Sequence, residues 1–409
     1  MGKLNLVLIK RNKREKSFQF YGLFAVGLAI FLLLILLFKI FSTGFSAFNQ
    51  TYLGVKIQIE KNVNLSELDA RSVLRENIRN MFPEVVSRSD KKNLYSLFSP
   101  GAYIEFEEML NSNNEETIDG YYYFLASDDL DMYFKGTVAR QGNSAGKIKP
   151  NQMKFVDDFE RMNLIKLQYN KYLLGSADSR NPEMAGILGA IYGSLFAILI
   201  AFATSFPLGI LTAIYLEKLA KRNAFSDLIE TNINNLAAVP SIVFGLLGLA
   251  IFLNFFELPR SASLVGGLTL GLMTLPTIVI ASRSAIKSVP PSIEEASIGL
   301  GSSKIQTIFN FTLPLAMPGI LTGTIIGIAR AIGETAPLLM IGMVAFIVDI
   351  PQGPLDASTA LPVQIFLWQD SPERAFVERT SAAIIVLLIF LFLLNITAVY
   401  LRKKLEKKW

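Results

Sequence analysis

Residues 294–314 read EEASIGLGSSKIQTIFNFTLP, a polar stretch between two of the longest apolar runs in the chain. At its start, Ser292 and Glu295 match the S-x-x-E spacing of a capping box, which predicts that a short helix begins here. Gly301 allows a turn with positive φ, and Leu313–Pro314 can begin the next helix because proline is tolerated in a first turn. The stretch therefore predicts a surface helix, a glycine turn and a return into an apolar helix.

Long runs without charge recur through the 409 residues. A bilayer core about 30 Å thick requires about 20 apolar residues at helical rise, and a helix satisfies its own backbone hydrogen bonds in lipid. A soluble protein would instead need several buried helices well beyond the usual ~11–12 residues, which excludes that class. We predict a mainly α, polytopic membrane protein with six transmembrane helices, at residues 20–41, 185–216, 235–256, 262–282, 314–348 and 380–401.

Two predicted spans, 185–216 and 314–348, are longer than one upright crossing needs. Each contains a proline, Pro207 or Pro337, which predicts tilt, a kink or extension beyond the bilayer. Glycines also recur at four-residue spacing, as in the run from Gly319 to Gly323, and small residues at this spacing let helices pack closely. We predict that these glycines form contacts within one subunit rather than a dimer motif.

Basic residues flank the outermost apolar runs. Those before the first run are Lys3, Lys10, Arg11, Lys13, Arg14 and Lys16, and those after the last are Arg402, Lys403, Lys404, Lys407 and Lys408. Because positive flanks stay in the cytoplasm, we predict that both termini are cytoplasmic, which requires an even number of spans. The first run could instead be a signal peptide, but it exceeds the usual h-region of about 7–15 residues, so an uncleaved anchor is favoured.

This topology divides the chain into four regions. We expect a basic cytoplasmic tail and first anchor at 1–42, an extracytoplasmic domain at 43–184, a membrane domain with the other five spans at 185–401, and a basic cytoplasmic tail at 402–409.

Residues 43–184 have ordinary soluble composition and are numerous enough to fold as one domain. Residues 52–60 alternate like a strand, and strands are also predicted at 121–126 and 131–138, on either side of a turn-rich segment. Residues 64–81 predict a helix capped by Asn64. We therefore expect a small α+β domain, in which no catalytic constellation is visible.

The composition excludes several kinds of chemistry. The chain has no cysteine and no histidine, so disulfides, thiol redox chemistry and histidine-based catalysis are absent. It contains no G-x-x-x-x-G-K-[ST] phosphate cradle, and the closest string, Gly301-Ser-Ser-Lys304, lacks the glycine spacing. Any ATP-driven work must therefore use a nucleotide site on another chain. We predict no cofactor, no metal site and no enzymatic activity of the chain itself.

Three motifs together resemble a known family. They are the stretch 294–314, TLPTIVIASR at 274–283, and PGILTGTIIGIARAIGETAPLL at 318–339. With them, residues 185–401 are similar to the PstA-like permease subunit of bacterial phosphate-specific ABC importers, and 127–136 resembles the outside extension of longer members. Ser297 and Phe311 depart from the usual alanine and isoleucine of the docking motif. The resemblance implies a type I ABC importer permease fold in the bacterial cytoplasmic (inner) membrane.

The same resemblance implies partners and a docking segment. The partners are cytoplasmic ATPase subunits, a second homologous permease subunit and an extracytoplasmic phosphate-binding protein, with no nucleic acid. A coupling helix is implied at about 291–301, with the ATPase-coupling residues Ser292, Glu295, Ala296, Ser297, Gly301, Leu313 and Pro314. The alternative for Glu295 is that it only caps its helix.

Arg330 and Glu334 are one helical turn apart within a long charge-free stretch. A charge at the bilayer centre costs about 2.5–3.5 kcal/mol on insertion scales, so such residues usually mark a pathway. The planar fork of arginine suits a tetrahedral oxyanion, while Glu334 either holds Arg330 in position or accepts a hydrogen bond from protonated phosphate. The alternative is an ion pair that neutralises itself.

The resemblance implies that Arg283 belongs to the anion path. On physical grounds alone, Arg283 is an arginine at the membrane boundary whose side chain extends to the interface.

We therefore predict a transmembrane permease subunit of an ATP-driven phosphate importer. Its substrate path for inorganic phosphate contains Arg330, Glu334 and Arg283, and a separate ATPase supplies the energy. One alternative is a permease for another oxyanion, such as sulfate, molybdate or a phosphonate. The other is a membrane sensor or adaptor that uses residues 43–184 to sense a ligand, and such a protein would not co-purify with an ATPase subunit.

Overall fold

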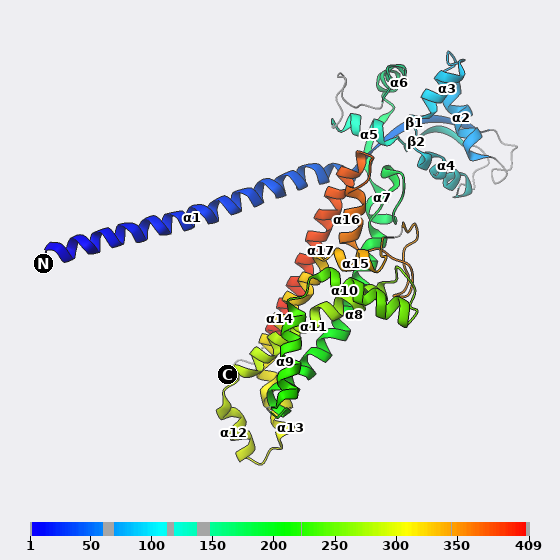
Figure 1. Ribbon diagram of the computed structural model, residues 1–409. Helices are drawn as coiled ribbons and strands as arrows, with labels where there is room; N and C mark the ends of the chain where they lie inside the picture. Colours follow the sequence, from blue (N-terminus) through cyan, green and yellow to red (C-terminus); the bar gives the residue numbers. More distant parts are fainter. Residues whose placement is uncertain are drawn as a thin grey trace.

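The computed structural model describes residues 2–59, 69–112, 118–136, 148–221, 223–344 and 346–405. Three parts are visible in Figure 1: a long N-terminal helix that diverges from the rest, a small α/β part, and a helical bundle that leads from this part to a helical tip at its other end. We call residues 49–169 the extension and residues 188–405 the bundle.

The N-terminal helix α1 (Gly2–Gly44) contains the first apolar run. Within its candidate span, Arg14–Phe48, the most apolar 18-residue window has a mean hydropathy of 2.9, and none of that window is buried within the chain. Its C-terminal end packs closely on the bundle, because a Cβ at Gly44 would overlap the side chain of Ile385. α1 is thus an apolar helix whose sides require lipid, in agreement with the first predicted span.

A three-stranded antiparallel sheet in the order β2-β1-β3 forms the centre of the extension. The strands are β1 (Asn49–Ile59), β2 (Ile118–Leu125) and β3 (Ile165–Tyr169). Alternate residues of a strand point to one face, and Leu53, Val55 and Ile57 of β1 enter a single apolar core with side chains from the surrounding helices. Those helices are α2 (Ala70–Met81), α3 (Arg88–Tyr95), α4 (Pro100–Ser112), α5 (Asp128–Phe134) and α6 (Pro150–Arg161).

The extension agrees with part of the sequence prediction. Within the described residues, strands occur at the two ranges 52–60 and 121–126, as predicted. The helix predicted for 64–81 begins only at Ala70, where the Asp69 side chain accepts a hydrogen bond from the backbone N–H of Arg71 at 3.2 Å. Asp69 is therefore the cap that Asn64 was predicted to be, and residues 60–68 lie outside the described part of the chain.

The strand predicted for 131–138 is wrong. Residues 128–134 form the helix α5, with Ser127 in the N-cap position and three aspartates in the first turn. Carboxylates there are favoured by the positive end of the helix dipole, so the acidic run begins a helix rather than forming a turn. Residues 137–138 lie outside the described part of the chain.

Five helices among the described residues are long and apolar enough to cross a membrane, and a sixth crossing results if one bent pair is counted as a span. Besides α1, they contain α8 (Leu188–Ile214), α11 (Ser263–Lys287), α14 (Leu313–Gly333) and α17 (Ala375–Leu405). α11 is central, because it packs against both α8 and α14. The predicted polytopic helical fold is therefore confirmed, although two spans differ in form.

Shorter elements connect these helices. They are η1 (Phe45–Phe48), α7 (Lys171–Gly175), η3 (Pro182–Met184), η4 (Tyr215–Leu219), α9 (Ala224–Ala237), α10 (Ser241–Gly248), η5 (Leu249–Phe255), α12 (Pro291–Gly299), α13 (Lys304–Thr307), η6 (Ile308–Thr312), α15 (Ala336–Met340) and α16 (Leu361–Gln369). η4, η5 and η6 are π-helical turns that continue the neighbouring helices.

The span predicted at 235–256 is not one straight helix. Ala224–Ala237 and Ser241–Phe255 are separated by a break and bent by 106°. Pro240 explains the break, because it lacks an N–H and disfavours helical backbone at the residue before it. This part of the chain is therefore a broken span or a re-entrant loop.

The span predicted at 314–348 is also interrupted. α14 ends at Gly333, and Glu334 has an extended backbone with φ −81° and ψ 115°. Pro337 then lies in the first turn of the short helix α15, so it begins a new helix instead of kinking a continuous one. Gly342, with φ +86°, turns the chain immediately after α15. By contrast, Pro207 lies inside the continuous helix α8.

Glycines bring the central helices together within one chain. A Cβ at Gly323 of α14 would overlap the Cβ of Ala281 on α11, and Gly319 lies against Ala285 one turn further along. The absence of a side chain therefore allows α14 and α11 to pack at close range. The prediction that these glycines form contacts within one subunit is confirmed.

Buried charges join the extension to α17. Lys135 Nζ lies 2.6 Å from Asp131 Oδ2 and 2.6 Å from Glu378 Oε1, and its side chain is 3% exposed. Arg379 is also buried, and its Nη1 donates a hydrogen bond to the carbonyl oxygen of Ala47 at 3.2 Å. We call Asp131, Lys135, Glu378 and Arg379 the junction cluster. Because its lysine is shared between two carboxylates from different parts of the chain, the cluster fixes the extension on the end of α17.

Candidate functional site

Arg330 lies on α14, beside the break between α9 and α10. It lines a small hollow together with Leu236, Ala237, Val239, Ser241, Phe244, Met273, Thr274, Thr277 and Gly327. Thr274 and Thr277 lie near the middle of α11, so the hollow is at mid-span. The break between α9 and α10 thus brings Ser241, at the start of α10, beside the cationic side chain of Arg330.

Among the described residues, the ion-pair partner of Arg330 is a single carboxylate. Arg330 Nε is 3.5 Å from Glu334 Oε1, and the two side chains are 66% and 23% exposed. The sequence placed both residues on one helical face, whereas Glu334 lies just beyond the end of α14. This long and open pairing leaves most of the guanidinium donors accessible.

The hollow beside Arg330 is small. Its volume is about 20 Å³, which is enough for a water molecule but not for a tetrahedral oxyanion. The accessible side of Arg330 therefore faces out of the chain rather than into an enclosed cavity. Within the described residues, this chain does not enclose a cavity of oxyanion size beside Arg330.

Arg283 lies elsewhere and is fully engaged. Its Nε is 2.5 Å from Glu217 Oε1, and its Nη2 is 2.8 Å from Glu230 Oε2. Lys287 Nζ, one turn further along α11, is 3.4 Å from the same Glu217 oxygen. These contacts tie the end of α11 to η4 and α9, and Arg283 does not line the Arg330 hollow. The structure therefore does not bring the two predicted path arginines together.

The predicted docking segment forms the tip of the bundle farthest from the extension (Figure 1). α12 begins at Pro291, and its N-cap residue Pro290 makes no side-chain capping bond. The capping box predicted for Ser292 and Glu295 is therefore wrong, because both residues lie inside the helix. A reciprocal capping box does occur at α13, where Ser303 and Gln306 bond each other's backbone N–H groups.

Polar contacts hold the tip from within. Ser297 is buried, and its hydroxyl shares a hydrogen bond of 3.0 Å with Thr307. Glu294 accepts a hydrogen bond from the Thr312 hydroxyl at 3.1 Å and forms an ion pair with Lys218 from η4. The short helix α12 is thus connected to η4, which follows α8, and to η6, which leads into α14.

The outer face of the tip exposes small and apolar residues beside a carboxylate. Glu295, Ala296 and Gly301 are exposed, and Gly301 has the predicted positive φ, at +92°. Leu300 is 88% exposed at the end of α12, which is unusual for a leucine outside a membrane span. Leu313 and Pro314 are half-buried in the first turn of α14 and belong to the helix rather than to this face.

Sequence reasoning missed several residues of both sites. Lys218 and Glu294 were not singled out, because an ion pair between distant segments has no local signature. Ser241 and Thr277 were missed because isolated hydroxyls are common in membrane helices. Pro240 was a usable signal, since a proline within an apolar run marks a break in a helix.

Two family models match the chain. One, described as a domain of unknown function (DUF3333), covers residues 6–144. The other, described as "Binding-protein-dependent transport system inner membrane component", covers residues 205–409. The two models cover different parts of the molecule. The first covers α1 and most of the extension, and the second covers most of the bundle.

Curated relatives match about half of the chain. The chain is 34% identical over 225 residues to "Phosphate transport system permease protein PstA 1" of Mycobacterium tuberculosis, which covers 54% of this chain and 72% of the relative. It is 32% identical over 228 residues to "Phosphate transport system permease protein PstA" of Yersinia pestis, covering 55% of this chain and 75% of the relative.

Among solved structures, the chain is similar to one titled "Inward facing conformations of the MetNI methionine ABC transporter". The two are 16% identical with a TM-score of 0.42, and the match covers 54% of this chain and 94% of that chain.

Proposed function

Because the chain belongs to the family of binding-protein-dependent transport system inner membrane components, we propose that it is the permease subunit of an ATP-driven phosphate importer. Its relatives from Mycobacterium tuberculosis and Yersinia pestis are named phosphate transport permeases, and each match spans more than two thirds of the relative. The chain's role is to form part of a path through the bilayer, and it contains no phosphate cradle of its own for ATP.

The observation that supports this function most strongly is the open Arg330 at mid-span. In a bilayer, a guanidinium with one partner at 3.5 Å and 66% exposure is costly unless it faces a watery cavity or an anion. Its planar donor fork fits the oxygens of a tetrahedral anion. Ser241 and Thr277, which line the same hollow, offer hydroxyls that can donate to further oxygens.

A second permease subunit completes the path. The hollow within one chain holds about 20 Å³, so the remaining walls come from another protein surface that meets α14 and the α9–α10 break. This arrangement places the anion between two subunits, with Arg330 on one side. Glu334 holds the guanidinium in position and accepts a hydrogen bond from a protonated phosphate oxygen, which fully deprotonated sulfate cannot donate.

The tip formed by α12 and α13 is the docking site for cytoplasmic ATPase subunits. Exposed Ala296 and Leu300 give a small apolar surface that fits a groove, while the buried Ser297–Thr307 contact keeps the tip rigid. Movement of the tip reaches η4 through the Glu294–Lys218 ion pair, and η4 carries Glu217, the partner of Arg283. In this scheme Arg283 transmits movement rather than binding the anion.

This function fixes an orientation in the inner membrane. The tip and both termini are cytoplasmic, and the extension lies outside, where an extracytoplasmic binding protein delivers phosphate. A single cysteine in the extension tests this orientation directly, because the natural chain contains none. Exclusive labelling from the cytoplasmic side would reverse it.

Uptake by the assembled transporter tests the function. The complex is purified through a tag on this chain, reconstituted with ATP on the side of the tip, and supplied with binding protein and radioactive phosphate. We expect ATP-dependent phosphate accumulation that excess sulfate does not inhibit, and a loss of about tenfold or more in Arg330→Ala. The matched control is Arg260→Ala, an exposed arginine outside the hollow. Normal uptake in Arg330→Ala, or equal inhibition by sulfate, would contradict the proposal.

A further inference from the structure

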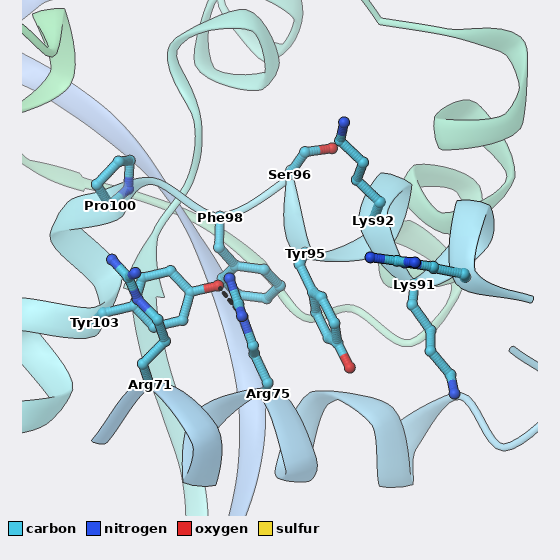
Figure 2. A pocket seen from close by; sticks show the side chains of 10 residues that line it. Arg71, Arg75, Lys91, Lys92, Tyr95, Ser96, Phe98, Pro100 and Tyr103 are labelled. Atoms are coloured by element: carbon cyan, nitrogen blue, oxygen red, sulfur yellow. Dashed lines mark hydrogen bonds between the residues drawn. The ribbon is translucent and has the colours of Figure 1, made fainter. Parts of the chain in front are cut away.

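The extension contains a second concentration of positive charge, distant from the bundle. A hollow of about 600 Å³ lies between α2, α3 and α4, and its cationic lining residues are Arg71, Arg75, Arg88, Lys91 and Lys92. Tyr95 and Tyr103 form its aromatic walls, and Figure 2 shows how these rings and the basic side chains gather around one space. We propose that this hollow binds a soluble anion that bears several phosphoryl groups.

The arginines are positioned by aromatic rings rather than by carboxylates. The Arg71 guanidinium lies 5.1 Å from the centre of the Tyr103 ring. Arg75 lies between two rings, 5.3 Å from the centre of Tyr95 and 5.5 Å from that of Tyr103 (Figure 2). Its Nε also donates a hydrogen bond to the Tyr103 hydroxyl at 3.4 Å. Stacking occupies the faces of a guanidinium and leaves its edge donors available for the planar, bidentate contacts that phosphoryl oxygens accept.

The charges of this hollow are not neutralised within the described part of the chain. No aspartate or glutamate is among its lining residues, and none of its five cations has a carboxylate within ion-pair distance among the described residues. Arg79, one turn beyond Arg75 on α2, instead pairs with Glu76 at 3.7 Å. Asp69 and Glu107 line the adjoining hollow that shares Arg71 and Tyr103, and Asp90 lies on α3 between Arg88 and Lys91 but is not among the lining residues of the basic hollow.

The spacing of the cations costs stability when no anion is bound. Arg71 and Arg75 are four residues apart on α2, and Arg88 and Lys92 are four residues apart on α3. Like charges at this spacing repel on a helix, by about 0.2–0.5 kcal/mol per pair. A multivalent anion relieves both repulsions at once, because it lies between the two helices. A single phosphate would leave much of a hollow this size empty.

The position of the hollow favours a soluble ligand over a lipid headgroup. In Figure 1, α3 lies at the end of the extension away from the bundle, whereas the apolar spans run from the junction toward the tip. A bilayer around those spans would not reach α3. The site does not depend on the proposed transport function, since it shares no residue with the Arg330 hollow.

Calorimetric titration of the full-length chain tests the proposal. The chain is held in nanodiscs of zwitterionic phosphatidylcholine and titrated with tripolyphosphate, and separately with inorganic phosphate, at about 150 mM salt so that diffuse attraction is screened. We expect one saturable tripolyphosphate site that is tighter than any phosphate site. Arg75→Gln should weaken tripolyphosphate binding about tenfold or more, and Arg330→Ala should leave it unchanged.

Two further variants separate a built site from a diffuse basic surface. Arg79→Gln removes another exposed arginine from the same helix and should change tripolyphosphate affinity less than about twofold. Tyr103→Leu keeps all five cations but removes the ring that positions two of them, and should weaken binding several-fold while the unfolding temperature shows that the extension remains folded. Equal losses in Arg75→Gln and Arg79→Gln, no effect of Tyr103→Leu, or no saturable binding would overturn the proposal. Binding only to vesicles with anionic lipid would assign the hollow to a membrane surface instead.

Discussion

The junction cluster and the Arg330 hollow both contain a positive charge, but the two charges differ in exposure and in the number of carboxylate partners. Lys135 is 3% exposed and lies 2.6 Å from two carboxylates, whereas Arg330 is 66% exposed and has one partner at 3.5 Å. A cation surrounded by counter-charges contributes to structure, because its removal leaves buried carboxylates without compensation. A cation with accessible donors contributes little to folding and remains available to an incoming anion. The comparison separates a charge that is enclosed by counter-charges from one whose donors are open to a ligand.

The largest effect should come from the junction cluster. Lys135→Ala leaves Asp131 and Glu378 buried side by side without their shared cation, and breaking such a buried pair costs about 3–5 kcal/mol. We expect a large fall in the unfolding temperature, or separation of the extension from α17 detected by limited proteolysis. The conservative control is Lys135→Arg, which keeps the charge. A stable Lys135→Ala protein would mean that water reaches the cluster and that its charges are not structural.

Arg330→Ala should behave in the opposite way. Its partner Glu334 is partly exposed, so loss of this pair should change the free energy of unfolding by about 0–1 kcal/mol, while phosphate uptake falls by about tenfold or more. Arg330→Lys keeps the charge but loses the planar fork, and we expect intermediate uptake. Unfolding measured by tryptophan fluorescence beside uptake gives both quantities. A fall in stability as large as that of Lys135→Ala would erase the distinction between the two regions.

At the tip of the bundle, a buried side chain and an exposed one should likewise differ in their effects on stability and on function, and both effects should be smaller. Ser297→Ala removes a buried hydrogen bond to Thr307 and should cost about 1 kcal/mol of stability. Leu300→Asp changes an 88% exposed side chain, so the fold should be unaffected while phosphate-stimulated ATP hydrolysis by the complex decreases. ATPase assays on matched amounts of folded complex measure this. Full stimulation in Leu300→Asp would show that docking uses another face.

The smallest effect concerns pH. Burial raises the pKa of Glu183 above its ordinary value, although a hydrogen bond from the Ser99 hydroxyl at 2.5 Å partly opposes this. An acid with a raised pKa in the folded state binds more protons when folded, so stability falls as pH rises from the unfolded pKa, about 4.5, through the folded one. Glu183→Gln should flatten this part of the curve of unfolding temperature against pH. An unchanged slope would show that Glu183 is not its source.

Much of the fold could be predicted because the bilayer imposes a simple rule on apolar runs. Length and hydropathy identified the spans, and glycine spacing identified the close packing of α14 on α11. The breaks at Pro240 and Gly333 were missed because hydropathy does not report backbone direction, although proline marked the first of them. In the extension, three aspartates after Ser127 favoured a helix start that alternation alone could not reveal.

Arg330 could be singled out as a candidate from the sequence, but the geometry around it could not be predicted. A charge within an apolar stretch marks Arg330 from sequence alone, since its cost requires a use. Its exposure, the small volume beside it and the separation from Arg283 depend on how α9, α10, α11 and α14 meet. The ion pairs of Arg283 with Glu217 and Glu230 join segments far apart in sequence, so no local pattern could have indicated them.

Thiol labelling beside Arg330 tests the central claim most directly. The natural chain has no cysteine, so Ser241→Cys places a single reactive group in the Arg330 hollow, and Thr231→Cys places a matched one on the exposed side of α9. In the assembled transporter during ATP-driven turnover, phosphate should slow labelling of Cys at 241 by several-fold, while sulfate and the Thr231 position show no such effect. Equal labelling of the 241 position with and without phosphate, in a complex that still accumulates phosphate, would contradict an anion path beside Arg330.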